Sequence, residues 1–153
     1  MRRTKQEIKS IDEIESIIQR AQVCPIGLSD GIIPYVVPVY FGYRRNYLFF
    51  HGASEGKKLE IIRRNSNVCF EMDTDHQIVK QEGPPCGCSG RYYSIIGFGK
   101  ASIVDHHGDK SSALSIINEH YDGEPYDFSD KEMESVTVVK IDITSMTGKK
   151  SGY

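Results

Sequence analysis

Apolar residues recur at helical spacing near the start of the chain. The isoleucines of residues 11–18 fall on one face of a helix with a period of 3.6 residues. Ser10 and Glu13 fit a capping box, in which a hydroxyl and an acidic side chain satisfy free backbone N–H groups. The pattern predicts a helix over residues 11–21 that turns its isoleucines toward the core.

Stretches rich in β-branched and aromatic residues follow. Residues 24–29 predict a short strand and residues 32–43 a second one, joined by an Asp-Gly hairpin signal. The second strand carries Pro34 and Pro38, each of which removes a backbone donor from a sheet ladder. The prolines indicate either a plain edge strand or a place where something other than a strand pairs.

The next stretch joins a strand to a helix. The apolar run 47–50 predicts a buried strand, and Gly52 and Gly56 mark a turn. Ser54 is a suitable N-cap for a helix that Asn65 can stop. We therefore expect a strand, a turn of small residues and a helix in direct succession.

Two lysines, Lys57 and Lys58, occupy the first turn of that helix. Lysines favour last turns, because the positive end of the helix dipole repels a cation. At the helix start they add to the dipole field, which favours a bound anion such as phosphate. A solvated lysine pair is the alternative, since no full nucleotide fingerprint is present. His51 lies beside this position and titrates near neutrality, so it is either a proton donor in a reduction or a structural histidine.

The second half of the chain adds more strands. Residues 68–72 predict a strand with Cys69 in the core, and residues 92–104 predict a long strand. Gly97 and Gly99 lie on one face of the long strand, where they indicate a bulge or the close approach of a ligand or another chain.

A helix capped by Asp109, a last strand over residues 136–143 and a basic tail complete the chain. Six or seven strands with three flanking helices predict a mainly β (α+β) fold, an antiparallel barrel rather than a doubly wound sheet. Without a repeat or a linker, residues 1–153 form one domain.

Composition places the chain among globular proteins. It has 153 residues, 39% of them hydrophobic and 26% charged, and a net charge of −2. This balance favours neither nucleic acid nor an anionic membrane as a partner. Because the sequence has no membrane-length apolar run and no signal-peptide core, we expect a cytoplasmic protein.

The four cysteines do not predict a metal or redox site. An even count without a signal peptide does not argue for disulfides. Cys86-Gly87-Cys88, even with His106 and His107, lacks the two-residue spacing of zinc and redox motifs. We expect free loop thiols and no metal.

Three stretches together resemble one family. They are Pro34–Val39, Phe50–Ala53 with Gly56–Lys58, and Tyr93–Ala101. In order and spacing they resemble the pyridoxamine 5'-phosphate oxidase-like flavin-binding split barrels, and among these the nitroimidazole-resistance (Nim) proteins. The resemblance runs from the first helix to the basic tail.

The resemblance implies a six-stranded split barrel and a homodimer with FMN, or FAD in its place, in the cleft between subunits. Lys57 and Lys58 would hold the phosphate with Ser54 and the helix start, and His51 would lie near the flavin ring. The other residues that the resemblance places at the flavin, in this subunit or its partner, are Val37, Pro38, Val39, Gly52, Ala53, Ser94, Ile95, Ile96 and Gly97.

Three functions fit this resemblance. The first is an enzyme whose reduced flavin passes electrons to a small substrate such as a 5-nitroimidazole or another nitroaromatic, with His51 as the proton donor. The second is a flavin-binding or electron-carrying module without a dedicated substrate, and the third is a haem-binding relative. The vitamin B6 reaction is not favoured, because the Arg-rich C-terminal segment of true pyridoxamine phosphate oxidases is not visible.

Overall fold

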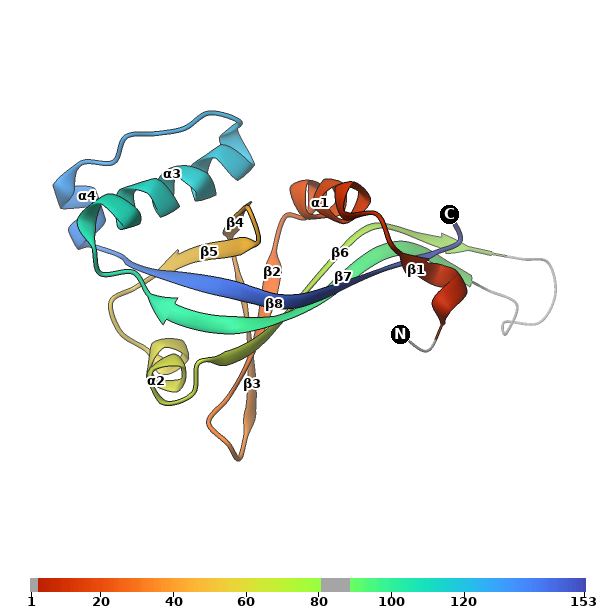
Figure 1. Cartoon of the computed structure of the whole chain (residues 1–153), viewed down its shortest axis with the longest axis horizontal. Coiled ribbons are helices and arrows are strands. Elements are labelled where there is room, and N and C mark those ends of the chain that lie inside the picture. The colour runs from red at the N-terminus through yellow and green to blue at the C-terminus, as the bar shows by residue number, and fades with distance from the viewer. Residues whose placement is uncertain (1–2, 81–88) are drawn as a thin grey trace.

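Figure 1 shows the computed structural model, which describes residues 3–80 and 89–153. These residues form eight strands, four α-helices and a 3-10 turn at Thr4–Gln6. The strands are β1 (Glu7–Ile8), β2 (Cys24–Ser29), β3 (Pro34–Val39), β4 (Phe41–Arg44), β5 (Tyr47–Gly52), β6 (Asn67–Val79), β7 (Ser89–Ile103) and β8 (Thr137–Ser151). The helices are α1 (Ile11–Arg20), α2 (Lys57–Arg64), α3 (His107–Asp122) and α4 (Asp130–Glu134).

The strands form one antiparallel sheet in the order β3-β2-β6-β7-β8-β5-β4, and β1 adds to β8. The long strands β6, β7 and β8 run side by side across the molecule, with α2 below them and α1 and α3 above them in Figure 1. Within the described ranges β3 and β4 each pair with one neighbour, so the sheet stays open. The predicted α+β split-barrel class is confirmed, with more strands and helices than we expected.

The core lies on the inner face of the curved sheet. Phe41, Phe50 and Phe70 are its largest fully buried side chains, and Ile17 and Ile18 of α1 belong to the same cluster. A smaller cluster under α3 and α4 contains Leu114, Ile117, Met133 and Val138. Burial of these apolar faces holds the helices on the sheet.

Several local predictions are confirmed. The Ser10 hydroxyl accepts a hydrogen bond from the Glu13 backbone N–H at 3.3 Å, at the start of α1; the Glu13 carboxylate pairs with Lys150 instead of completing the predicted capping box. Asn65 is the C-cap of α2. Pro34 and Pro38 lie on β3, an edge of the sheet, where a missing donor is tolerated.

Two strand predictions need correction. The expected single strand over residues 32–43 is two strands, β3 and β4, with Tyr40 between them. The basic tail belongs to β8, because it continues the ladder with β7, in which Lys149 pairs with Ser94. Lys150 also binds Glu13 Oε1 of α1 at 2.9 Å, which secures the end of that strand.

Both helix starts differ from the prediction. Ser54 does not cap α2. The N-cap is Gly56, whose φ of 125° is positive, and no side chain of the described residues makes a capping hydrogen bond there. Likewise His106, not Asp109, is the N-cap of α3, and Asp109 falls in the first turn.

Cys69 is not in the core, contrary to the prediction. Its side chain is exposed on the outer face of β6, opposite the buried Val68 and Phe70. A Cβ at Gly27, its partner on β2, would lie 2.5 Å from the Cys69 sulfur. The glycine therefore makes room for the thiol.

The glycine pair of β7 marks a bulge, as predicted, and also a close approach, although not of the predicted ligand or second chain. The β7–β8 register shifts between Phe98 and Gly99. A Cβ at Gly97 would lie 2.1 Å from Cζ of Phe70, and one at Gly99 would lie 2.6 Å from the Asp142 carbonyl oxygen. In this chain, then, the approaching groups are its own core ring and its own backbone.

None of the described helices is both long and apolar enough to cross a membrane.

Candidate functional site

The connection between β5 and α2 carries most of the predicted site. β5 ends with His51 opposite Val138 and Gly52 opposite Thr137 on β8. The chain then reverses through Gly56, whose carbonyl oxygen accepts from the Leu59 N–H at 3.0 Å and begins α2. Since no described side chain caps this start, the first N–H groups of α2 can meet an anion.

Lys58 folds back over the end of β5. A Cβ at Gly52 would lie 2.5 Å from the Lys58 ammonium nitrogen, so the ammonium lies on the glycine beside His51. Burial first, and then the Lys58 charge, lower the pKa of His51. The His51 imidazole therefore stays neutral to a lower pH than an ordinary histidine.

Lys57 reaches in another direction, toward β3. Its ammonium nitrogen lies 4.8 Å from the centre of the Tyr35 ring, a cation–π contact. The backbone N–H groups of Ile33 and Ile32 lower the pKa of Asp30, and Lys57 adds to this effect. Tyr35 is not among the residues predicted for the site, although it lies within the Pro34–Val39 motif.

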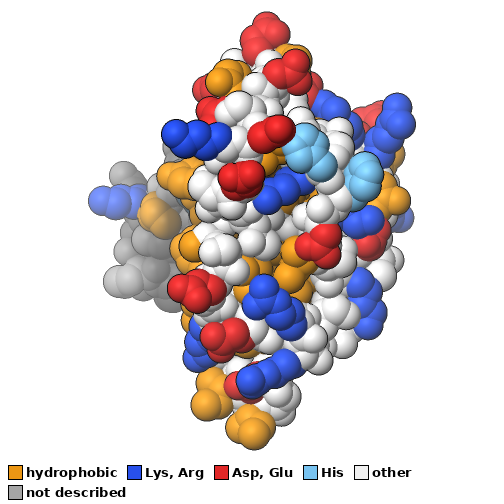
Figure 2. All heavy atoms as spheres, turned by 90° about the vertical axis from the view of Figure 1, so that its left-hand side faces the viewer, with side chains coloured by type: hydrophobic (Ala, Val, Ile, Leu, Met, Phe, Trp, Pro, Cys, Tyr) orange, Lys and Arg blue, Asp and Glu red, His pale blue; other side chains and the backbone are white. Residues whose placement is uncertain are grey.

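The β3 residues of the prediction lie on the same side as Lys57. Val37 is half-buried, Pro38 is exposed and Val39 is buried. Ala53 and Ser54 are exposed on the turn before α2. The structure therefore gathers β3, the turn and both lysines at one end of the molecule, where Figure 2 shows basic side chains among exposed hydrophobic ones.

The β7 residues of the prediction lie elsewhere. Ile95 is in the core, Gly97 faces Phe70, and Ile96 is 48% exposed on the outer face. Cross-strand pairing places Gly97 in line with Val37 across β7, β6, β2 and β3. The two residues are therefore three strand spacings, or about 14 Å, apart. One chain therefore does not bring residues 94–97 into contact with the residues around Lys57.

An apolar patch covers the outer face of this part of the sheet. Val36 is 65% exposed and Phe98 53% exposed. Paired residues point to the same face, so Val36, Cys69 and Phe98 line up across β3, β2, β6 and β7, and Ile96 lies beside Phe98. We call Val36, Cys69, Ile96 and Phe98 the outer-face patch.

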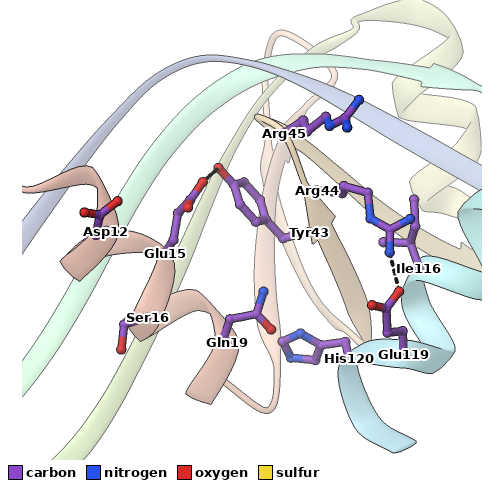
Figure 3. Close-up of a pocket in the computed structure, with 10 residues that line it drawn as sticks. All are labelled: Asp12, Glu15, Ser16, Gln19, Tyr43, Arg44, Arg45, Ile116, Glu119 and His120. Atoms are coloured by element: carbon purple, nitrogen blue, oxygen red, sulfur yellow. Dashed lines mark hydrogen bonds and ion pairs between the residues drawn. The ribbon is translucent and has the colours of Figure 1, made fainter. Parts of the chain in front are cut away.

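A polar pocket of about 560 Å³ lies apart from these residues, between α1, β4 and α3 (Figure 3). The Tyr43 hydroxyl donates to Glu15 Oε1 at 3.0 Å, and Arg44 pairs with Glu119. Arg44 and Glu119 thus neutralise each other within the pocket, and none of the predicted flavin-site residues lines it.

A second hollow, of about 460 Å³, does include a predicted site residue. His51 lines it with Tyr40, Tyr121 and Phe128. No local pattern predicts this hollow, because its walls come from Tyr40, β5, α3 and the segment around α4.

The structure offers no metal site among the residues it describes: no three His, Cys, Asp or Glu side chains are grouped to hold an ion. His107 instead approaches Asp130 at 2.8 Å, and His106 approaches Asp109 at 3.7 Å. The loop thiols of residues 86 and 88 lie outside the described residues.

Residues 10–150 match the sequence profile of the family described as pyridoxamine 5'-phosphate oxidase. A Bacteroides thetaiotaomicron structure, named as a candidate 5-nitroimidazole antibiotic resistance protein, is 37% identical. That match has a TM-score of 0.84 and covers 94% of this chain and 86% of the other. No curated protein sequence matches the chain.

Two more distant structures share the fold. An FAD- and haem-binding protein from Mycobacterium smegmatis is 16% identical, with a TM-score of 0.85, over 97% of this chain and 74% of its own. A flavocytochrome from Azotobacter vinelandii is 15% identical, with a TM-score of 0.83, over 100% of this chain and 72% of its own. At such identities the likeness concerns the fold alone.

Proposed function

Because this chain belongs to the pyridoxamine 5'-phosphate oxidase family, we propose that it is a flavin-dependent oxidoreductase that reduces a nitroaromatic compound such as a 5-nitroimidazole. The observation that carries the proposal is the start of α2, where two lysines meet an uncapped helix terminus. The 37% identity to the candidate nitroimidazole-resistance protein supports the substrate class.

The residues at this end of the molecule fit a flavin phosphate, and we propose FMN as the cofactor. Lys58 brings its ammonium to Gly52, and Lys57 is held toward β3 by Tyr35. Both charges add to the field of the helix start, where a phosphate dianion is favoured. A bound flavin supplies the electron transfer, while the chain binds it, orients it and delivers protons.

We further propose that the working unit is a homodimer. The lysines and residues 94–97 belong to one flavin site in the family pattern, yet they lie apart in one chain. A second copy could bring its residues 94–97 to the lysines of the first. The outer-face patch supports this arrangement, because exposed apolar patches often mark interfaces.

His51 is the proposed proton donor. Reduction of a nitro group to a nitroso group takes two electrons and two protons and releases water. An external hydride donor of the nicotinamide class supplies two electrons and one hydrogen nucleus through the flavin, and the second proton comes from His51, which solvent then reprotonates. The imidazole is placed for this role at the end of β5, next to Lys58, and because its lowered pKa confines the protonated donor to lower pH, reduction should quicken as pH falls.

The visible spectrum of the purified protein tests the cofactor first. We expect a yellow dimer with about one flavin per subunit. A haem spectrum, or a colourless protein that takes up no added FMN, would contradict the proposal.

Lysine substitutions then test the phosphate site. Charge-assisted hydrogen bonds contribute about 1.5–3 kcal/mol each, so Lys57→Ala with Lys58→Ala should weaken FMN binding on the order of a hundredfold or more. Arg63→Ala with Arg64→Ala is the matched control, because it removes two charges from the last turn of the same helix. Equal FMN affinity in the two double variants would rule out the phosphate site at Lys57 and Lys58.

A further inference from the structure

We propose that the hollow beside His51 binds the ring of a neutral, single-ring aromatic substrate, an inference that rests on the function proposed above. We call this hollow the aromatic slot. It is lined by the side chains of Tyr40, His51, Leu114, Ile117, Tyr121 and Phe128, among others.

The walls of the aromatic slot are aromatic and well supported. The rings of Tyr40 and Tyr121 meet edge to face, with centroids 5.4 Å apart and planes at 88°. The Tyr121 hydroxyl donates to the Gln22 carbonyl oxygen at 3.1 Å and accepts from the Phe41 N–H at 3.0 Å. The ring of Tyr121 is therefore fixed before a ligand arrives.

The floor is apolar. Leu114 and Ile117 are buried on the face of α3 that packs toward the sheet. Phe128 closes the side nearest α4. A flat ring in the slot would exchange water for apolar and aromatic contacts on several sides.

The polar groups at the rim are already engaged. The amide nitrogen of Asn118 donates to a backbone carbonyl at 2.9 Å, and the Ser135 hydroxyl donates to the Glu132 carbonyl at 2.8 Å. A Glu132 carboxylate oxygen accepts a hydrogen bond from the backbone N–H of Ser129, the N-cap of α4, at 2.8 Å. In contrast, no side-chain hydrogen bond among the described residues uses the His51 imidazole, so it is available to a ligand.

Charge and size favour a neutral single ring. The Glu132 carboxylate at the rim of the slot disfavours an anion, and its Oε2 already accepts two hydrogen bonds from Ser129. A neutral ring also enters without the cost of desolvating a charge. A cavity of roughly 150 Å³ holds benzene, so about 460 Å³ has room for one ring with its substituents.

The aromatic slot and the α2 start lie on opposite faces of the end of β5. His51 lines the slot, and the next residue, Gly52, carries the Lys58 ammonium on the other face of the strand. A ring in the slot would lie beside His51, the group proposed to deliver its proton. His51, whose pKa the Lys58 charge lowers, is therefore the residue that connects the slot to the α2 start.

Nitrobenzene binding to the flavin-loaded protein tests the slot. Calorimetric titration should show that Tyr40→Ala and Phe128→Ala each raise the nitrobenzene Kd about three- to tenfold, because each removes one aromatic contact. Flavin occupancy should stay at the wild-type level. Tyr40 is 66% exposed, so its removal should leave the fold intact, and Tyr40→Phe should retain wild-type affinity.

Tyr47→Ala is the control, since it removes an exposed tyrosine from β5 that does not line the slot. If Tyr40→Ala and Phe128→Ala bind nitrobenzene as tightly as Tyr47→Ala, the ring binds elsewhere and the inference is overturned, even if the protein reduces nitroaromatics. If the wild type takes up no flavin, the proposed function fails instead. The same titrations on flavin-free protein would still decide whether the slot binds the ring.

Discussion

Replacing Gly97 by alanine should destabilise the fold itself, with or without flavin. The added Cβ would lie 2.1 Å from Phe70 Cζ and 2.5 Å from its Cε1, more than an ångström short of an ordinary contact. Phe70 is 1% exposed, so its ring has core side chains around it and little room to move.

Two effects of opposite sign set the magnitude. Without a clash, alanine in a strand is about 0.5–1 kcal/mol more favourable than glycine, because glycine loses more chain entropy on folding. Forcing an extra carbon into a packed core costs roughly 1–3 kcal/mol, and the close approach here argues for the upper end. The net loss should be about 2 kcal/mol, which lowers Tm by about 4–8 °C for a chain of this size.

Thermal unfolding of the flavin-free protein, followed by circular dichroism, measures this loss. Gly90→Ala is the matched control on the same strand, since among the described residues its Cβ would come no closer than 3.9 Å to a side chain, that of Tyr92. That variant should be unchanged or slightly stabilised. Adding Phe70→Leu to Gly97→Ala should cost less than the two single losses together, with a coupling of about 0.5–3 kcal/mol.

Equal Tm values for Gly97→Ala and Gly90→Ala would refute this reasoning. If Gly97→Ala then lost only flavin, the glycine would serve the approach of a ligand rather than the packing of the core.

Three further predictions concern His51 and the first helix. His51→Ala should keep its flavin but slow single-turnover nitrobenzene reduction by roughly 10²–10⁴-fold, and an unchanged pH–rate profile would remove the residue from the mechanism. Because burial and Lys58 lower the pKa of folded His51, the unfolded chain binds the proton more readily, so stability should fall as pH drops below the ordinary value of 6.5 toward the lowered pKa. Urea unfolding across this range should show a flatter pH dependence in His51→Gln. Ser10→Ala should cost about 1 kcal/mol in the same urea assay, because it removes the hydroxyl that caps α1.

Local chemistry in the sequence predicted the elements that depend on neighbouring residues. The start of α1 follows from Ser10 and Glu13, which interact three residues apart. Val68, Phe70 and Met72 alternate along β6 and point to the core, so Cys69 between them must point to the other face. The prediction overlooked this consequence of the alternation.

Long-range contacts determined what the sequence could not predict. The tail lacks apolar alternation, yet it is a strand because it pairs with β7 and because Lys150 meets Glu13 from the other end of the chain. The Lys57 and Lys58 pair was visible in the strand–turn–helix order. Tyr121, by contrast, joins the site only when α3 packs beside β5.

The two described cysteines differ sharply in their surroundings. Burial first, and then Glu71, raise the pKa of the Cys24 thiol well above its ordinary range, and the side chain is fully buried. Cys69 is exposed in the middle of the outer-face patch. The chain therefore carries its own chemical reporter of assembly: alkylation at Cys69, read by peptide mapping against the inert Cys24, would slow when a second copy covers that face and recover when dilution separates the subunits.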